Sequence, residues 1–168
     1  MRLLAITATA AAFTATTAHA DLDVRFIEGA PKDRFVISSA TGLCADEAAA
    51  ITVDLGPSAG KLIFDVTDAG AGVEVFQPFE LVTGGEQVIE APEVADGDTR
   101  VTLLVSDLAP GAEVAFTIDV DDTINAREIT VSRSEITGAM AMLAVGGVEV
   151  TGTFDESARA KVPWSGCS

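Results

Sequence analysis

The sequence predicts an all-β protein that consists of a single immunoglobulin-like antiparallel β-sandwich. Apolar residues alternate with polar ones at a period of two in many short segments, which is the pattern of half-buried strands. No window of about 11 residues places apolar side chains at the i, i+3, i+4 and i+7 positions of a helix. Groups rich in glycine, proline and aspartate separate the alternating segments roughly every ten residues, as in sandwiches and barrels. A closed barrel is the alternative arrangement of the same strands.

The clearest alternating segment covers residues 114–121. The residues on one of its faces are all apolar: Val114, Phe116, Ile118 and Val120. The residues between them are small or acidic, so we expect one face to lie in the core and the other in water. The same alternation predicts strands over residues 51–55, 62–66 and 101–105, and at Ile129 and Val131.

Local signals refine this pattern. The Gly146-Gly147 pair between two apolar runs predicts a two-residue hairpin, because both central positions of a type I′ turn need a positive φ. Pro78 predicts an edge strand, a bulge or a crossover, since proline has no N–H for an interior ladder. The alanine-rich residues 44–50 are compatible with one helical turn or with a loop. Met140 and Met142 alternate on one strand face, where we expect them to fill the core.

Residues 1–20 have the organisation of a secretory signal peptide. Arg2 provides a positive start, an uncharged run follows, and Ala18-His19-Ala20 fits the A-x-A cleavage rule. A membrane anchor is the alternative, but the run is short, rich in alanine and threonine, and followed at once by Asp21 and Asp23. We therefore expect a signal peptide of residues 1–20, a β-sandwich domain of residues 21–168, and a periplasmic or secreted location.

The chain is strongly acidic, with 26 Asp and Glu residues against 10 Lys and Arg residues and a net charge of −16 at pH 7. Such a surface repels phosphate backbones and anionic lipids, so the composition argues against nucleic-acid binding. No segment after the signal peptide has the length and apolar character of a membrane span. The expected partner is a cell-surface, periplasmic or matrix component whose identity the sequence does not give.

Few side chains are available for catalysis. The only histidine, His19, lies in the signal peptide, and the chain has no tyrosine. The mature domain therefore lacks the residues for a Ser-His-Asp triad, a Cys-His pair or a His-ligated zinc. We assign no catalytic residue and expect a non-enzyme. A carboxylate-dependent hydrolase is the alternative from another functional class.

An acidic strand end provides the candidate metal site. Calcium takes 6–8 oxygen ligands, and carboxylates on one face of an extended backbone can share one ion. The candidate ligands are Asp119, Asp121, Asp122 and Asn125. The loop Asp96-Gly97-Asp98 could complete the cage, and residues 65–68 form a second candidate. The alternative is a solvated turn at the rim of a sheet, so calcium is the one cofactor that the sequence brings into consideration.

The two cysteines are expected to pair. Cys44 and Cys167 belong to a chain that we expect to be exported, and exported chains meet oxidising conditions. Their disulfide would tie the C-terminal segment to the early part of the domain. We expect Trp164 to pack over this bridge or to close the end of the core, with a ligand-binding platform as the alternative.

Four stretches of the mature chain carry resemblances. Residues 108–117 resemble the L-x-P-G-x-x-x-x-F start of a strand in bacterial immunoglobulin-like modules, which implies fold alone. Residues 25–35, residues 72–80, and residues 116–123 with 127–130 resemble short exported proteins of marine, Rhodobacterales-type alphaproteobacteria labelled "aggregation factor core protein". That label implies calcium-dependent cell adhesion, but no functional residue is transferred from it.

Together these observations predict a non-catalytic exported β-sandwich that binds an unknown partner, with a role in cell-surface adhesion or aggregation. The alternative within the same fold is a calcium-stabilised extracellular module.

Overall fold

The computed structural model describes residues 21–69, 76–124 and 130–165. It confirms the all-β class, because these residues form twelve strands and a single four-residue helix, α1 (Arg133–Ile136). The strands are arranged in two antiparallel sheets of five strands and one sheet of two strands. The predicted signal peptide, residues 1–20, lies outside the described residues.

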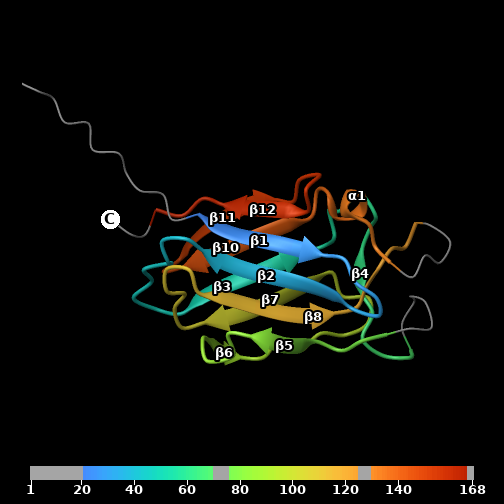
Figure 1. The fold of residues 1–168 in the computed structure, drawn as a ribbon, viewed down its shortest axis with the longest axis horizontal. Coiled ribbons are helices and arrows are strands. Elements are labelled where there is room, and N and C mark those ends of the chain that lie inside the picture. The colour runs from blue at the N-terminus through green and yellow to red at the C-terminus, as the bar shows by residue number, and fades with distance from the viewer. Residues whose placement is uncertain (1–20, 70–75, 125–129, 166–168) are drawn as a thin grey trace, which may run out of the picture.

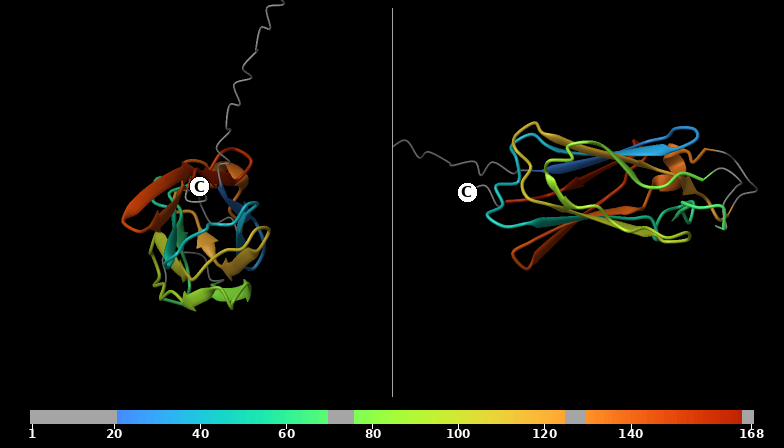
Figure 2. Two further views of the ribbon diagram at one scale, coloured as in Figure 1. Left: turned by 90° about the vertical axis from the view of Figure 1, so that its left-hand side faces the viewer. Right: turned by 90° about the horizontal axis from the view of Figure 1, so that it is seen from below.

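The two large sheets face each other in a sandwich-like arrangement (Figures 1 and 2). The first sheet has the order β12 (Arg159–Val162), β1 (Leu22–Ile27), β2 (Asp33–Ser39), β8 (Glu113–Ile118) and β5 (Glu80–Thr83). The second has the order β11 (Val148–Thr153), β10 (Met140–Val145), β3 (Ala49–Asp54), β7 (Arg100–Val105) and β6 (Val88–Glu90). The two-stranded sheet pairs β4 (Ile63–Phe64) with β9 (Val120–Asp121).

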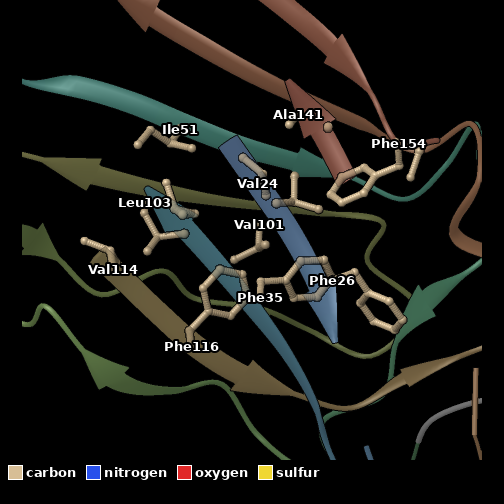
Figure 3. Packing of buried hydrophobic residues seen from close by; sticks show 14 of the residues in the cluster. Val24, Phe26, Phe35, Ile51, Val101, Leu103, Val114, Phe116, Ala141 and Phe154 are labelled. Atoms are coloured by element: carbon tan, nitrogen blue, oxygen red, sulfur yellow. The ribbon is translucent and has the colours of Figure 1, made fainter. Parts of the chain in front are cut away.

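The core lies between the large sheets and is built from the inward residues of their alternating strands. Figure 3 shows Phe35 of β2 and Phe116 of β8 side by side, with ring centroids 5.1 Å apart. Phe154 meets Phe35 edge to face at 6.5 Å. Full burial of such a ring stabilises the fold by about 1.5–3 kcal/mol, so this aromatic group anchors one sheet to the other.

The glycine hairpin is confirmed. β10 pairs with β11 from Met140 opposite Thr153 to Val145 opposite Val148, and Gly146 and Gly147 both have positive φ. The prediction for the methionines is wrong. The core face of β10 is formed by Ala141, Leu143 and Val145, so the alternation leaves Met140 and Met142 only half buried on the other face.

The prediction of a hydrated outer face for residues 114–121 is also wrong. On this face Ala115 and Thr117 are buried, as are the apolar residues on the opposite face. β8 is an interior strand, and its outer residues lie beside Val36 and Arg34 of β2 in the pairing register. The long arginine stem can cover small neighbours, which explains how both faces of β8 leave water.

For several other segments the observed structure differs from the predicted strand or decides between the alternatives. The strand predicted at residues 62–66 is reduced to β4, and the segment at residues 44–50 leads into β3 as a loop rather than a helical turn. Ile129 lies outside the described residues, and Val131 is buried but precedes α1 instead of forming a strand. Pro78 precedes β5, which is an edge strand of the first sheet, as its missing N–H predicts.

Trp164 closes one end of the core. Its side chain packs against the core cluster, and its Nε1 donates a hydrogen bond to the Leu43 carbonyl oxygen at 2.7 Å. Cys167 lies outside the described residues, so its pairing with Cys44 stays a prediction. The tryptophan contact is compatible with that pairing, because Trp164 reaches Leu43, the residue before Cys44, and precedes Cys167 by only three residues. Peptide mapping without reduction would test it.

The described residues contain no helix that is long and apolar enough to cross a membrane.

Candidate metal centre

The two-stranded sheet places three aspartates next to one another. β8 ends at Ile118, and after Asp119 the chain continues as β9, which pairs with β4. The Asp65 N–H donates to the Asp119 carbonyl oxygen at 3.2 Å, so these two residues lie opposite each other beyond the paired Phe64 and Val120. Asp121 is two residues from Asp119 and therefore projects from the same face.

The three side chains form a buried carboxylate cluster, which we call the aspartate cluster: Asp65, Asp119 and Asp121. One carboxylate oxygen from each lies within 4.8 Å of the other two. The residues are only 1%, 6% and 4% exposed. Asp65 Oδ1 and Asp119 Oδ2 are buried without a hydrogen-bond partner among the described residues. Burying an ionised carboxylate oxygen without a partner is costly, so these two oxygens favour a bound cation or proton.

The electrostatics of the cluster reflect this cost. Burial, reinforced by the charge of Asp121, raises the pKa of Asp65 from its ordinary 3.8 to about 6. Burial, together with the charges of Asp121 and Asp65, raises the pKa of Asp119 to about 7. Each carboxylate therefore opposes the ionisation of its neighbours, and a bound cation would relieve this repulsion.

A fourth buried aspartate, Asp33, lies beside the cluster. It is the first residue of β2, opposite Ile118, and its Oδ1 accepts the Gly29 N–H at 3.0 Å. Burial raises the pKa of Asp33 to about 8, and the charges of Asp119 and Asp121 add to this rise. Sequence analysis missed this residue because it follows a Gly-Ala-Pro-Lys run, where an aspartate is expected to be an exposed turn residue.

Asp96 holds the segment that follows Asp65. Its Oδ1 accepts the Val66 N–H at 2.7 Å and the Thr67 N–H at 2.8 Å, and its Oδ2 accepts the Thr67 hydroxyl. These bonds, the Thr67 hydroxyl first, lower the pKa of Asp96. Asp98 uses its Oδ2 to accept the Ala95 N–H at 2.8 Å. The predicted 96–98 loop therefore lies near the cluster, and Asp96 holds the segment after Asp65 by hydrogen bonds. The carboxylates of this loop are not among the three that form the cluster.

The structure brings together part of the predicted ligand set. Asp119 and Asp121 from the first candidate segment meet Asp65 from the second. Asp122 is outside the cluster, and its Oδ1 accepts the Ile124 N–H at 2.9 Å within its own turn. Asn125 lies outside the described residues. To predict that these two segments meet, one would have needed to know that β4 pairs with β9. Neither segment carries a local sequence signal for that pairing.

The spacing of the carboxylate oxygens suits one coordination sphere. Calcium–oxygen distances are about 2.3–2.6 Å, so oxygens on opposite sides of one ion lie about 4.6–5.2 Å apart. The three carboxylate oxygens lie within 4.8 Å of one another, which is close enough for all three to contact one ion. The chemistry fits as well, since calcium is a hard cation that prefers carboxylate oxygens and accepts them bidentately.

Access to the cluster favours an ion over a larger molecule. Three hollows formed by described residues are lined by residues outside the cluster. With exposures of 6% or less, the carboxylates of the cluster do not present a surface on which a polymer chain could lie. A desolvated cation is small enough to be enclosed by them.

No family model, curated protein or solved structure matches the chain. The interpretation of the aspartate cluster therefore rests on the geometry and charge of the chain's own residues.

Proposed function

We propose that the protein is an exported, non-catalytic β-sandwich of the immunoglobulin-like kind, whose aspartate cluster binds Ca²⁺. The observation that carries this proposal is the convergence of three buried carboxylates, two of which have an oxygen without a hydrogen-bond partner among the described residues. Such an arrangement is stable at neutral pH only if something cationic neutralises it.

Among the described residues, no cationic side chain forms an ion pair with Asp65 or Asp119. Protons are one source of neutralisation, as the raised pKa values indicate, and a divalent cation is the other. Near neutral pH protons are scarce, while calcium reaches millimolar concentrations in many extracellular settings, so we favour the metal.

Calcium would fasten two segments of the chain whose strand pairing is only two residues long. Asp65 follows the two-residue β4, whereas Asp119 and Asp121 flank Val120 of the equally short β9. Two-stranded pairings of this length are marginal on their own. A shared ion would hold this end of the sandwich in one conformation, and a rigid end suits a module that binds a partner in the periplasm, at the cell surface or in the matrix.

The hydrolase alternative fits this geometry less well. Glycosidases hold their two carboxyl groups about 5–9.5 Å apart around a sugar or a water molecule. In the aspartate cluster the nearest oxygens are within 4.8 Å of one another and are nearly inaccessible. Raised pKa values alone do not argue for catalysis, because any close carboxylate cluster produces them.

Calorimetric titration with CaCl₂ tests the proposal. Chelator-treated protein at pH 7.5 should release or absorb saturable heat, and its melting temperature should rise with calcium. At a concentration one hundred times Kd, the gain in stability is about 2.7 kcal/mol. Asp119→Asn should lose this response, whereas the control Asp46→Asn, an exposed position in the loop before β3, should keep it. No heat and no melting shift at millimolar calcium would refute the proposal.

The partner and the location require a separate experiment. The purified protein would be immobilised and mixed with detergent extracts of the cell envelope, with and without chelator. We expect one envelope component to be retained and to be released by the chelator, because the rigid end depends on calcium. Retention that is indifferent to both chelator and Asp119→Asn would separate partner binding from the metal. Mass analysis of the exported protein should place its first residue at Asp21.

A further inference from the structure

Three arginines line a hollow outside the aspartate cluster. The hollow has a volume of about 250 Å³ and lies where the end of β1, the start of β12 and α1 come together (Figure 1). Its basic residues come one from each element: Arg25, Arg159 and Arg133. The remaining lining is formed by residues 26–28 and Ser157. We call this feature the arginine hollow.

The charge of the arginine hollow is opposite to that of the molecule. The chain carries 26 acidic and only 10 basic residues, yet three of the basic residues and a single acidic one, Glu28, line this space. Among the lining residues positive charge is therefore in excess, which favours an anion over a cation in this space.

Two of the arginines are placed together at an electrostatic cost. Arg25 and Arg159 are direct partners in the register of β1 and β12, and like charges in that position repel each other. Two carboxylates reduce the repulsion: Asp23 Oδ1 lies 3.2 Å from Arg159 Nη2 and 3.9 Å from Arg25 Nε, and Glu113 Oε2 lies 3.6 Å from Arg25 Nη2. These contacts use few of the five N–H donors that each guanidinium has.

The third arginine adds charge that no carboxylate balances. Arg133 is exposed on α1, and among the described residues its guanidinium takes part in no ion pair. α1 is fixed in place because Ile136 is buried and the Glu135 carboxylate accepts the Ser132 N–H at 2.7 Å. The hollow is therefore framed by elements whose backbones do not depend on the arginine side chains.

We propose that the arginine hollow binds an oxyanion group, a carboxylate or a sulfate or phosphate ester, on a small and otherwise uncharged molecule. Guanidinium groups recognise planar and tetrahedral oxyanions through paired N–H donors. Ile27, which is 45% exposed, lines the same space and offers contact for the apolar part of the ligand. Polyanions are disfavoured, because beyond the hollow their charges meet the acidic surface within the screening length of about 8 Å.

A titration followed by NMR tests this proposal with defined probes. Sodium sulfate and, in a second series, sodium acetate would be added to the ¹⁵N-labelled protein, with NaCl adjusted to hold the ionic strength constant. We expect saturable shifts of the Nε–Hε signals of Arg25, Arg133 and Arg159. The stronger of the two probes identifies whether a tetrahedral or a planar oxyanion is preferred.

Two variants with the same change of charge separate the site from general electrostatics. Arg133→Gln should weaken binding about fivefold, the upper end of the range for an exposed ion pair. Lys161→Gln is the matched control, because Lys161 is two residues from Arg159 on β12 but lines a neighbouring hollow instead. It should change the affinity less than twofold. Both positions are exposed, so unchanged melting temperatures are expected to confirm intact folds.

Three results would overturn the proposal: shifts that grow linearly without saturation, equal weakening in the two variants, or the same shifts with chloride as the added anion. The outcome is independent of calcium, since the hollow and the aspartate cluster share no residue. Repeating the titration with Asp119→Asn should leave the oxyanion affinity unchanged.

Discussion

Asp54 and Asp119 are both buried aspartates at strand ends, but their surroundings differ. Asp54 ends β3 and is held by Arg100, whose Nε and Nη2 lie 2.8 and 2.7 Å from its Oδ2. Its Oδ1 accepts the Gly56 N–H at 2.9 Å. Asp119 has Asp65 and Asp121 beside it instead of an arginine, and its Oδ2 is buried without a hydrogen-bond partner among the described residues.

The difference teaches where the counter-charge of a buried carboxylate comes from. At Asp54 the chain supplies a cation and a backbone donor, so the charge is satisfied as soon as the protein folds. At the aspartate cluster the backbone of Val120 supplies a donor to Asp119, but among the described residues no cation pairs with Asp65 or Asp119, so we propose that the counter-charge comes from solution. The first arrangement is a permanent part of the fold, and the second makes the fold depend on its ionic surroundings.

Removing the built-in partner should have the largest effect on stability. In Arg100→Gln the Asp54 carboxylate stays buried with only its backbone donor, and breaking such pairs costs about 3–5 kcal/mol when both partners are buried. Because Arg100 is 67% exposed, we expect a smaller loss of about 1–3 kcal/mol in urea unfolding. Saturating calcium should not restore the loss. A variant as stable as the wild type would show that the two aspartates are equivalent.

Replacing a member of the cluster should have the opposite effect on the metal-free protein. Asp119→Asn removes one of three repelling charges while keeping the shape, so we expect the free energy of unfolding to rise by about 1 kcal/mol at pH 7.5 without calcium. Calcium affinity should fall at least about tenfold, since it follows the number of charged ligands. Thermal melts with and without calcium measure both quantities. Destabilisation of the metal-free variant would mean that Asp119 is satisfied as it stands.

The pH dependence of stability should differ between the metal-free and calcium-loaded protein. The pKa values of Asp65, Asp119 and Asp33 are raised to about 6, 7 and 8, so the folded state holds protons that the unfolded chain has released. Their stabilising effect is complete below about pH 4 and is lost as pH rises through 6 to 8. The lowered pKa values of Asp96 and Asp155 act in the opposite direction at the acidic end.

We therefore expect the melting temperature of the metal-free protein to fall between pH 5 and pH 8. With saturating calcium this fall should disappear, because the ion holds the carboxylates in their charged form. Parallel pH profiles with and without the ion would contradict this expectation.

The smallest expected effect concerns Asp96, which holds the segment after Asp65 by hydrogen bonds. Asp96→Ala removes the acceptor for the N–H groups of Val66, which is buried, and Thr67, which is exposed. We expect a stability loss smaller than that of Arg100→Gln. Calcium affinity should fall only a few-fold, because Asp65 is less firmly placed but still present. A loss of calcium binding as complete as in Asp119→Asn would instead make Asp96 a direct ligand.

Much of the strand pattern could be predicted from the sequence, because alternation at a period of two encodes which side of a half-buried strand faces the core. This alternation predicted β3, β7 and β8, and together with the glycine pair it predicted the β10–β11 hairpin. It failed for the outer face of β8 and the residue that follows the strand, because Thr117 and Asp119 are polar and yet buried. Alternation describes one strand in isolation, and neighbouring strands and loops decide whether the second face meets water.

The candidate site was predictable only in part for the same reason. Asp119 and Asp121 could be recognised in the sequence as an acidic strand end. The segment that contains Asp65 could be recognised as a second candidate. Their union depends on a long-range pairing between β4 and β9, each of two residues, for which local sequence carries no signal. The burial of Asp33 could not be predicted from the sequence, because the burial that raises its pKa exists only after the first sheet has formed.

The most direct test of the central claim is a crystal structure of the protein grown in millimolar calcium. We predict one ion bound by Asp65, Asp119 and Asp121, with calcium–oxygen distances of about 2.3–2.6 Å. The unpartnered oxygens of Asp65 and Asp119 should be among its ligands. The claim would be contradicted by a well-ordered cluster in which the carboxylates bond to one another through shared protons and calcium is absent or bound elsewhere.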